Sequence, residues 1–131
     1  MDDILVPVAP GELIDKLTIL QLKSERIDDA AKLANVAIEQ SALIAVANQA
    51  IPKSDELQRL WDELYQINAD LWVIEDDIRI CESRDDFGAE FIRLARAVYQ
   101  TNDRRAAVKK QINLLLGSVL VEEKSYADTG K

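Results

Sequence analysis

An unbroken heptad pattern runs through the middle of the chain, and it constrains the fold more than any other feature of the sequence. Apolar residues recur at alternating spacings of three and four positions: Leu57, Leu60, Leu64, Ile67, Leu71, Ile74, Ile78 and Cys81. This spacing places the apolar side chains along one face of an α-helix. A repeat sustained over this length is typical of a helix that packs against another helix.

The segment that follows predicts a helical hairpin. Residues 83–88 (SRDDFG) interrupt the helical pattern, and a second periodic segment begins at residue 89 and ends at Gly117. Glycine commonly terminates helices because it tolerates a left-handed backbone. Two long helices, 54–83 and 89–117, joined by a short loop must pack antiparallel.

The remaining segments predict further helix and two extended ends. Residues 1–10 contain two prolines among β-branched residues, which favours an extended arm. Residues 11–50 carry a helical period, but Asp28 and Asp29 could interrupt it and cap a second helix, so one helix or two are both compatible with the sequence.

The tail, residues 118–131, could be extended and pair with residues 4–8. The sequence therefore predicts a single all-α domain over residues 1–131. Its architecture is an antiparallel helical bundle built on a long, coiled-coil-like helical hairpin, with short extended N- and C-terminal segments.

Composition excludes several kinds of active site. The 131 residues include no histidine and one cysteine, and their formal net charge is −8. The absence of histidine excludes Ser-His-Asp triads, Cys-His pairs and zinc sites with histidine ligands. We predict no metal site and no cofactor, and we assign no catalytic residue. The acidic surface would repel a polyanion, so we expect no nucleic-acid partner.

Three features favour a cytoplasmic protein. The single cysteine, Cys81, cannot form an internal disulfide. The first residues, Met1-Asp2-Asp3, lack the positive charge of a secretory signal. The uncharged stretch 41–52 is too short to span a bilayer, so we expect no membrane insertion.

Polar side chains interrupt the apolar stripes of both predicted hairpin helices. Folding the hairpin about Asp86 brings Asn68 level with Arg105, and Glu75 level with Val98 and Asn102. A polar layer between the helices is therefore expected. The candidate ligand-binding residues that belong to it or flank it are Asn68, Trp72, Glu75, Arg79, Asn102, Arg105 and Lys109.

Two interpretations of this layer remain open. In the first, Arg and Lys stems cover the core and pair with glutamate, or a buried Asn pair fixes the register of the helices. In the second, the converging cations and amides beside Trp72 form a pocket for a small carboxylate, phosphate or sugar nucleotide.

An aromatic edge accompanies the polar layer on the same helix. Trp61, Tyr65 and Trp72 follow one another at spacings of four and seven residues. Such a stripe packs against a third helix or forms an exposed subunit interface, where Trp and Tyr are enriched. We name these three residues as a candidate interface and expect a homodimer.

Three blocks of sequence carry a resemblance to a known family. They are residues 10–20 (PGELIDKLTIL), 71–82 (LWVIEDDIRICE) with 86–88 (DFG), and 95–105 (ARAVYQTNDRR) with 121–126 (VEEKSY). Together they resemble a family of small, mainly bacterial proteins known as domain of unknown function 6165. The resemblance covers nearly the whole chain, and it implies no activity and no functional residues.

Two function classes follow from these observations. The leading hypothesis is a non-enzymatic interaction or accessory protein that acts through helical surfaces and has a protein partner or a second copy of itself. The alternative is a helical-bundle enzyme or small-anion binder that uses Arg, Lys, Asn and Glu between the helices. Positioned cations suffice for some reactions without histidine or metal.

Overall fold

The computed structural model describes residues 1–128, and within that range it contains four α-helices and no strand. The helices are α1 (Pro10–Arg26), α2 (Ala30–Ala50), α3 (Asp55–Ser83) and α4 (Ala89–Leu115). Of the described residues, 73% are helical, which confirms the all-α fold predicted from the sequence. The last three residues of the expected tail, 129–131, lie outside the described residues.

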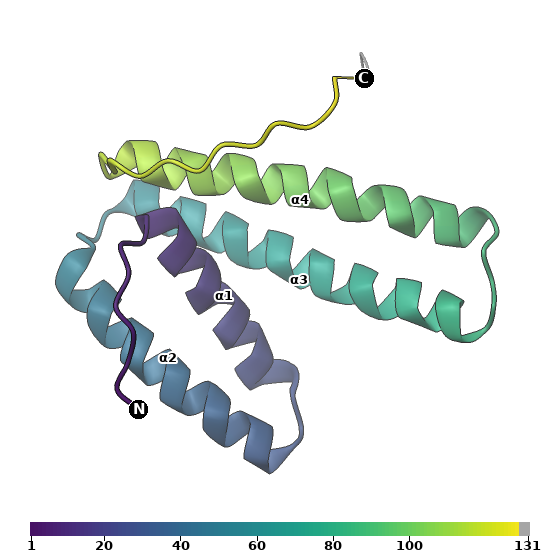
Figure 1. The fold of residues 1–131 in the computed structure, drawn as a ribbon, viewed down its shortest axis with the longest axis horizontal. Helices are drawn as coiled ribbons and strands as arrows, with labels where there is room; N and C mark the ends of the chain where they lie inside the picture. Colours follow the sequence, from purple (N-terminus) through teal and green to yellow (C-terminus); the bar gives the residue numbers. More distant parts are fainter. Residues whose placement is uncertain (129–131) are drawn as a thin grey trace.

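Helices α3 and α4 form the predicted antiparallel hairpin (Figure 1). The hydroxyl of Ser54 caps α3 by accepting a hydrogen bond from the backbone N–H of Leu57 at 3.1 Å. Gly117, which follows α4, has φ +66°, the left-handed conformation expected of a helix-terminating glycine. Both predicted boundaries of the hairpin are thus explained by local backbone chemistry.

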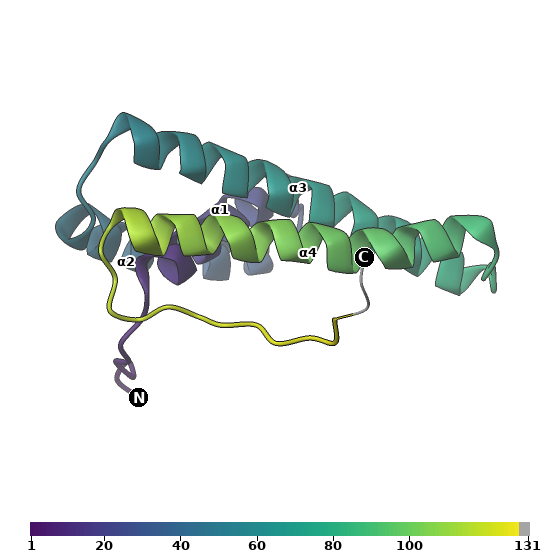
Figure 2. The same ribbon diagram turned by 90° about the horizontal axis from the view of Figure 1, so that it is seen from above.

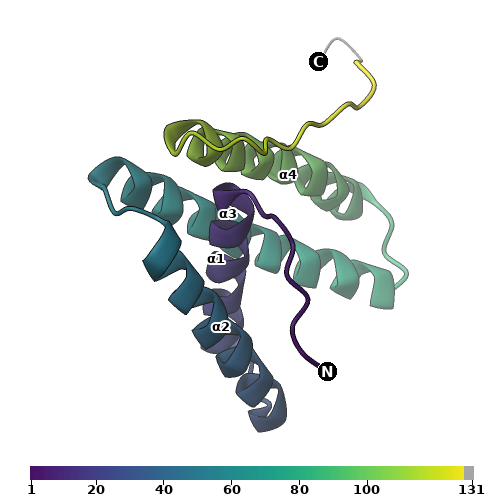
Figure 3. The ribbon, with the colours of Figure 1, turned by 60° about the vertical axis from the view of Figure 1, so that its left-hand side comes forward.

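Residues 11–50 form two helices, which resolves the question that the sequence left open. Asp29 is the N-cap of α2, and its side chain accepts a hydrogen bond from the backbone N–H of Lys32 at 2.9 Å. This cap begins the second helix, whereas the first ends at Arg26, followed by Ile27 in an extended conformation. Helices α1 and α2 then cross one end of the hairpin and leave its far end uncovered (Figures 1 and 3).

Helix α1 is the central element, because it packs against α2, α3 and α4. The main core lies between α1, α3 and α4. Its buried residues are Ile14, Leu57, Leu60, Leu64, Ile67, Val108 and Ile112. Farther along α3, Leu71, Ile74 and Ile78 are only half-buried, because α1 does not extend to that end of the hairpin.

Helix α2 packs against α1, and most of its surface is exposed. Its 21 residues include two charged side chains, Lys32 and Glu39, and its one buried residue is Ala47. Within the described residues, α2 is the one helix that is long and apolar enough to cross a membrane when length and composition alone are considered. Eleven per cent of its most apolar window is buried.

The two terminal segments do not pair as strands. Residues 1–9 and 118–128 contain no strand, so the possible pairing of residues 4–8 with the tail is wrong for the described part of the chain. The C-terminal segment instead runs along α4 (Figure 2). Three ion pairs of 3.4–3.6 Å hold it there: Lys109–Glu122, Lys110–Glu123 and Lys124–Asp103.

Candidate functional site

A buried carboxylate from α1 organises the polar residues between the helices. The side chain of Asp15 is 1% exposed, because α1 is enclosed by α2 on one side and by the hairpin on the other. Arg105 of α4 donates from Nε to Asp15 Oδ1 at 2.9 Å, and its Nη2 pairs with the second carboxylate oxygen. This is a bidentate arrangement, the strongest form of a carboxylate–guanidinium pair.

Neutral partners complete the hydrogen bonding of this carboxylate. Asn68 of α3 donates from Nδ2 to Asp15 Oδ1 and to Thr18 Oγ1, both at 2.9 Å. The Thr18 hydroxyl donates in turn to the backbone carbonyl of Asp15 at 2.7 Å. Among the described residues, no buried side-chain nitrogen or oxygen lacks a hydrogen-bond partner. The network is closed, as a stable buried polar cluster requires.

Lys109, one turn after Arg105 on α4, extends the cluster towards the surface. Its Nζ donates to Glu12 Oε2 at 2.6 Å and lies 3.4 Å from Glu122 Oε2 and 3.9 Å from Asp15 Oδ2. Burial opposes the charge of Lys109, but the hydrogen bond to Glu12 and the charge of Asp15 outweigh it and raise its pKa above the ordinary value. The hydrogen bond from Arg105 to Asp15 likewise raises the pKa of the guanidinium. Both groups are cations at neutral pH.

The start of α1 approaches α4 closely beside this cluster. The backbone N–H of Gly11 donates to Asn113 Oδ1 at 2.8 Å, which satisfies one of the free donors in the first turn of α1. A Cβ atom on residue 11 would lie 2.5 Å from the carbonyl oxygen of Lys109. Glycine is therefore required at this position for α1 to reach α4.

The structure brings together four of the seven predicted site residues. Asn68, Arg105 and Lys109 meet around Asp15, and Asn102 Oδ1 lies 3.5 Å from Arg105 Nη1. The expected polar layer therefore exists in part.

The other predicted members do not join it. Glu75 forms no ion pair or hydrogen bond with Arg105 or Asn102. It pairs instead with Arg79 at 3.4 Å, and both side chains are exposed. Trp72 is half-buried, and its ring lies 5.9 Å from the guanidinium carbon of Arg26.

Five members of the cluster are not among the predicted site residues: Glu12, Asp15, Thr18, Asn113 and Glu122. The sequence does contain a signal for Asp15. Apolar residues surround more than half of the circumference of α1, as in a helix buried on several sides. A carboxylate within such a helix must find a cation or several donors.

The aromatic edge packs against α1. Trp61 is half-buried and contacts the main core, and the hydroxyl of Tyr65 donates to Glu25 of α1 at 2.6 Å. This hydrogen bond raises the pKa of Tyr65. These contacts match the first interpretation of the aromatic stripe, in which it packs against a third helix. Much of the surface of the three rings is therefore covered within one copy of the chain.

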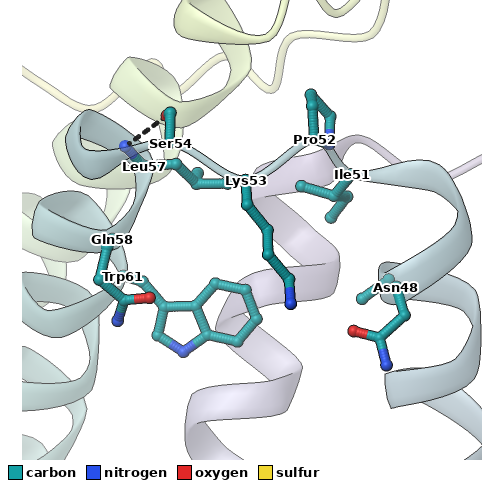
Figure 4. Close-up of a pocket in the computed structure, with 9 residues that line it drawn as sticks. Asn48, Ile51, Pro52, Lys53, Ser54, Leu57, Gln58 and Trp61 are labelled. Carbon is teal, nitrogen blue, oxygen red and sulfur yellow. Dashed lines mark hydrogen bonds between the residues drawn. The ribbon is translucent and has the colours of Figure 1, made fainter.

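Two clefts lie near the candidate residues. One, of about 240 Å³, lies between the end of α2 and the start of α3, where the side chain of Lys53 extends between Asn48 and the ring of Trp61 (Figure 4). The other, of about 320 Å³, is open to solvent beside Lys109 and is also lined by Glu12 and Glu122. Among residues 1–128, no three His, Cys, Asp or Glu side chains gather as metal ligands would.

Comparison with known families identifies the chain. Residues 4–130 match the family described as "Family of unknown function (DUF6165)". The chain belongs to this family. The match spans nearly all of this DUF6165 member, including all four helices and every residue of the Asp15 cluster. Neither a curated protein nor a solved structure matches it.

Proposed function

We propose that this DUF6165 protein is a non-enzymatic interaction protein that acts through the exposed apolar surface of α2 and the N-terminal arm. The observation that carries the proposal is the charge balance of the inter-helix cluster. Its two cations, Arg105 and Lys109, are already paired with three carboxylates, those of Glu12, Asp15 and Glu122. A small anion would enter a site with net negative charge.

The geometry of the cluster supports the same conclusion. The bidentate pair uses both carboxylate oxygens of Asp15, and Arg105 does not line the cleft beside Lys109. A ligand would have to displace Asp15, which is buried and would lose its cation. Breaking a buried pair is strongly unfavourable, so this arrangement suits a structural contact better than a binding site.

Much of the apolar surface that remains exposed is on α2 and the N-terminal arm. Ile38 and Val46 of α2 are 71% and 51% exposed, and Leu5 of the arm is 91% exposed. Grouped apolar surface of this kind marks interaction sites on soluble proteins. The net charge of −8 supports a protein partner over a nucleic acid.

A thermal-unfolding panel tests this proposal against the small-anion alternative. A ligand at a hundred times its dissociation constant would stabilise the protein by about 2.7 kcal/mol, which corresponds to several degrees. We expect no such shift with phosphates, sugar nucleotides or dicarboxylates. A shift in the wild type that disappears in Lys109→Gln would contradict the proposal, because it would place an anion at the inter-helix cluster.

A further inference from the structure

We infer that a second copy of this chain docks along the groove between the N-terminal arm, α1 and α2, so that the protein self-associates through this surface. This inference rests on the proposed interaction function and names its partner. It differs from the aromatic edge, which packs against α1 within one copy.

The groove is large and mostly apolar. It encloses about 590 Å³, and its lining includes Leu5 and Val6 of the arm, Leu13 of α1, and Leu43 and Val46 of α2. The arm contacts the groove only loosely, since Ile4, Leu5 and Val6 are at least 65% exposed. Apolar side chains therefore remain in water on both sides of the groove, which favours docking of another apolar surface.

Charge favours α2 as the helix at which two copies can meet. Each copy carries a net charge of −8, so most contacts between copies would bring acidic residues together. The 21 residues of α2 contain one cation, Lys32, and one anion, Glu39, and are therefore neutral overall. Two copies can approach along this helix without the repulsion that acts elsewhere.

The ends of the arm and the groove are complementary in charge. The arm begins with Asp2 and Asp3, whereas the groove is lined by Lys16 of α1. Lys23 lies seven residues later and therefore on the same side of α1. Neither lysine forms an ion pair with any residue in the range 1–128. The acidic tip of one arm thus matches the cationic side of the groove in a second copy.

The area available is sufficient only if α2 and the arm both take part. A helix of 21 residues is about 32 Å long and about 10 Å wide, so a contact between two such helices buries roughly 600 Å² in total. Stable interfaces bury about 1,200 Å² or more. The nine-residue arm, extended over about 30 Å, supplies the remainder when it lies against the other copy. Truncating the arm should therefore weaken the dimer.

A lipid surface fits these charges less well than a second copy. Helices that lie in the membrane interface carry Lys and Arg on their polar face, and anionic lipids attract basic segments. Helix α2 has one lysine, and the whole protein is strongly acidic.

Sedimentation velocity of the full chain at micromolar concentration tests the inference. The molecular mass of the wild type from sedimentation should be about 29 kDa, twice the chain mass of 14.7 kDa. Val46→Glu and Leu5→Glu each place a charge in the contact, and each should raise the dimer dissociation constant by at least about tenfold. Ile92→Glu is the matched control, because Ile92 is a half-exposed helical residue of α4 outside the groove, and it should leave the dimer intact.

A charge reversal tests the orientation of the arm. Lys16→Glu should weaken the dimer, and adding Asp2→Lys and Asp3→Lys to the same chain should restore it. Circular dichroism confirms that each variant is folded.

A wild-type mass of 14.7 kDa would overturn the inference, and so would a dimer that tolerates both Val46→Glu and Leu5→Glu. Co-sedimentation of a monomeric wild type with phospholipid vesicles would overturn it in favour of a membrane surface. These outcomes bear on the second copy as the partner. The proposed interaction function is contradicted by a different result, the ligand-induced thermal shift.

Discussion

Asp15→Asn is expected to lower the free energy of unfolding by about 3 kcal/mol, the low end of the cost of breaking a buried ion pair. Asparagine keeps the size of the side chain, so no cavity is created, but the guanidinium of Arg105 loses its anion. Arg105 is 29% exposed, and water therefore compensates it only partly. Thermal unfolding should show a fall in melting temperature of roughly 10 °C for a chain of this size.

Glu75→Gln is the matched control for Asp15→Asn. Residue spacing predicts Glu75 within the polar layer between the helices, but Glu75 forms an exposed pair with Arg79 one turn along its own helix. Exposed pairs of this kind contribute at most about 0.5 kcal/mol, so the variant should unfold close to the wild type. Equal melting temperatures for Asp15→Asn and Glu75→Gln would refute the organising role of Asp15.

Gly11→Ala should also be strongly destabilising, by about 3 kcal/mol, although alanine is the better helix former. The new Cβ would meet the Lys109 carbonyl oxygen at 2.5 Å and Asn113 Oδ1 at 2.8 Å. The first of these atoms belongs to the backbone of α4, so α1 must move away from α4. That movement would break the hydrogen bond from Gly11 to Asn113 and disturb the adjacent Lys109–Glu12 pair.

Gly88→Ala separates this packing effect from a general effect of replacing glycine. A Cβ at residue 88 would lie 3.4 Å from Asp86 Oδ1, an ordinary contact, and the residue is the N-cap of α4. Loss of a glycine cap costs at most about 1 kcal/mol. Chemical denaturation of both variants should give a clearly lower midpoint for Gly11→Ala. If Gly11→Ala is as stable as Gly88→Ala, the close approach of α1 to α4 is not required for stability.

The helical hairpin could be predicted from sequence because its signals are local and repeated. The heptad pattern identified α3, the break before Gly88 gave the loop, and Gly117 marked the end of the second helix. Each signal depends on residues close together in the chain. The pairing of α3 with α4 then follows from the short connection between them.

The position of α1 could not be derived in the same way. The sequence predicts an apolar stripe within residues 11–50, but neither the end of α1 nor the fact that α1 contacts all three other helices. Asp15 is therefore absent from the predicted site residues, although it is buried and pairs with Arg105, ninety positions later. Such long-range contacts depend on helix crossing, which no local pattern specifies.

The polar layer shows the same limit at the level of single residues. Hairpin geometry correctly placed Asn68 level with Arg105, since both are fixed by the register of two antiparallel helices. It failed for Glu75, which is exposed and pairs with Arg79 on its own helix. The register of the two hairpin helices can be read from the spacing of residues in the sequence. The burial of a side chain on these helices also depends on where a third helix packs.

A double-mutant cycle on Asp15 and Arg105 tests most directly whether the inter-helix cluster is a structural contact. The free energies of unfolding of the wild type, Asp15→Asn, Arg105→Met and the double variant would be measured by urea denaturation. If the two side chains stabilise the fold through each other, each single change is costly and the double change costs much less than their sum. The coupling should then be at least about 2 kcal/mol. Additive effects of the two changes would contradict this account, because the polar residues between the helices would then not depend on each other for stability.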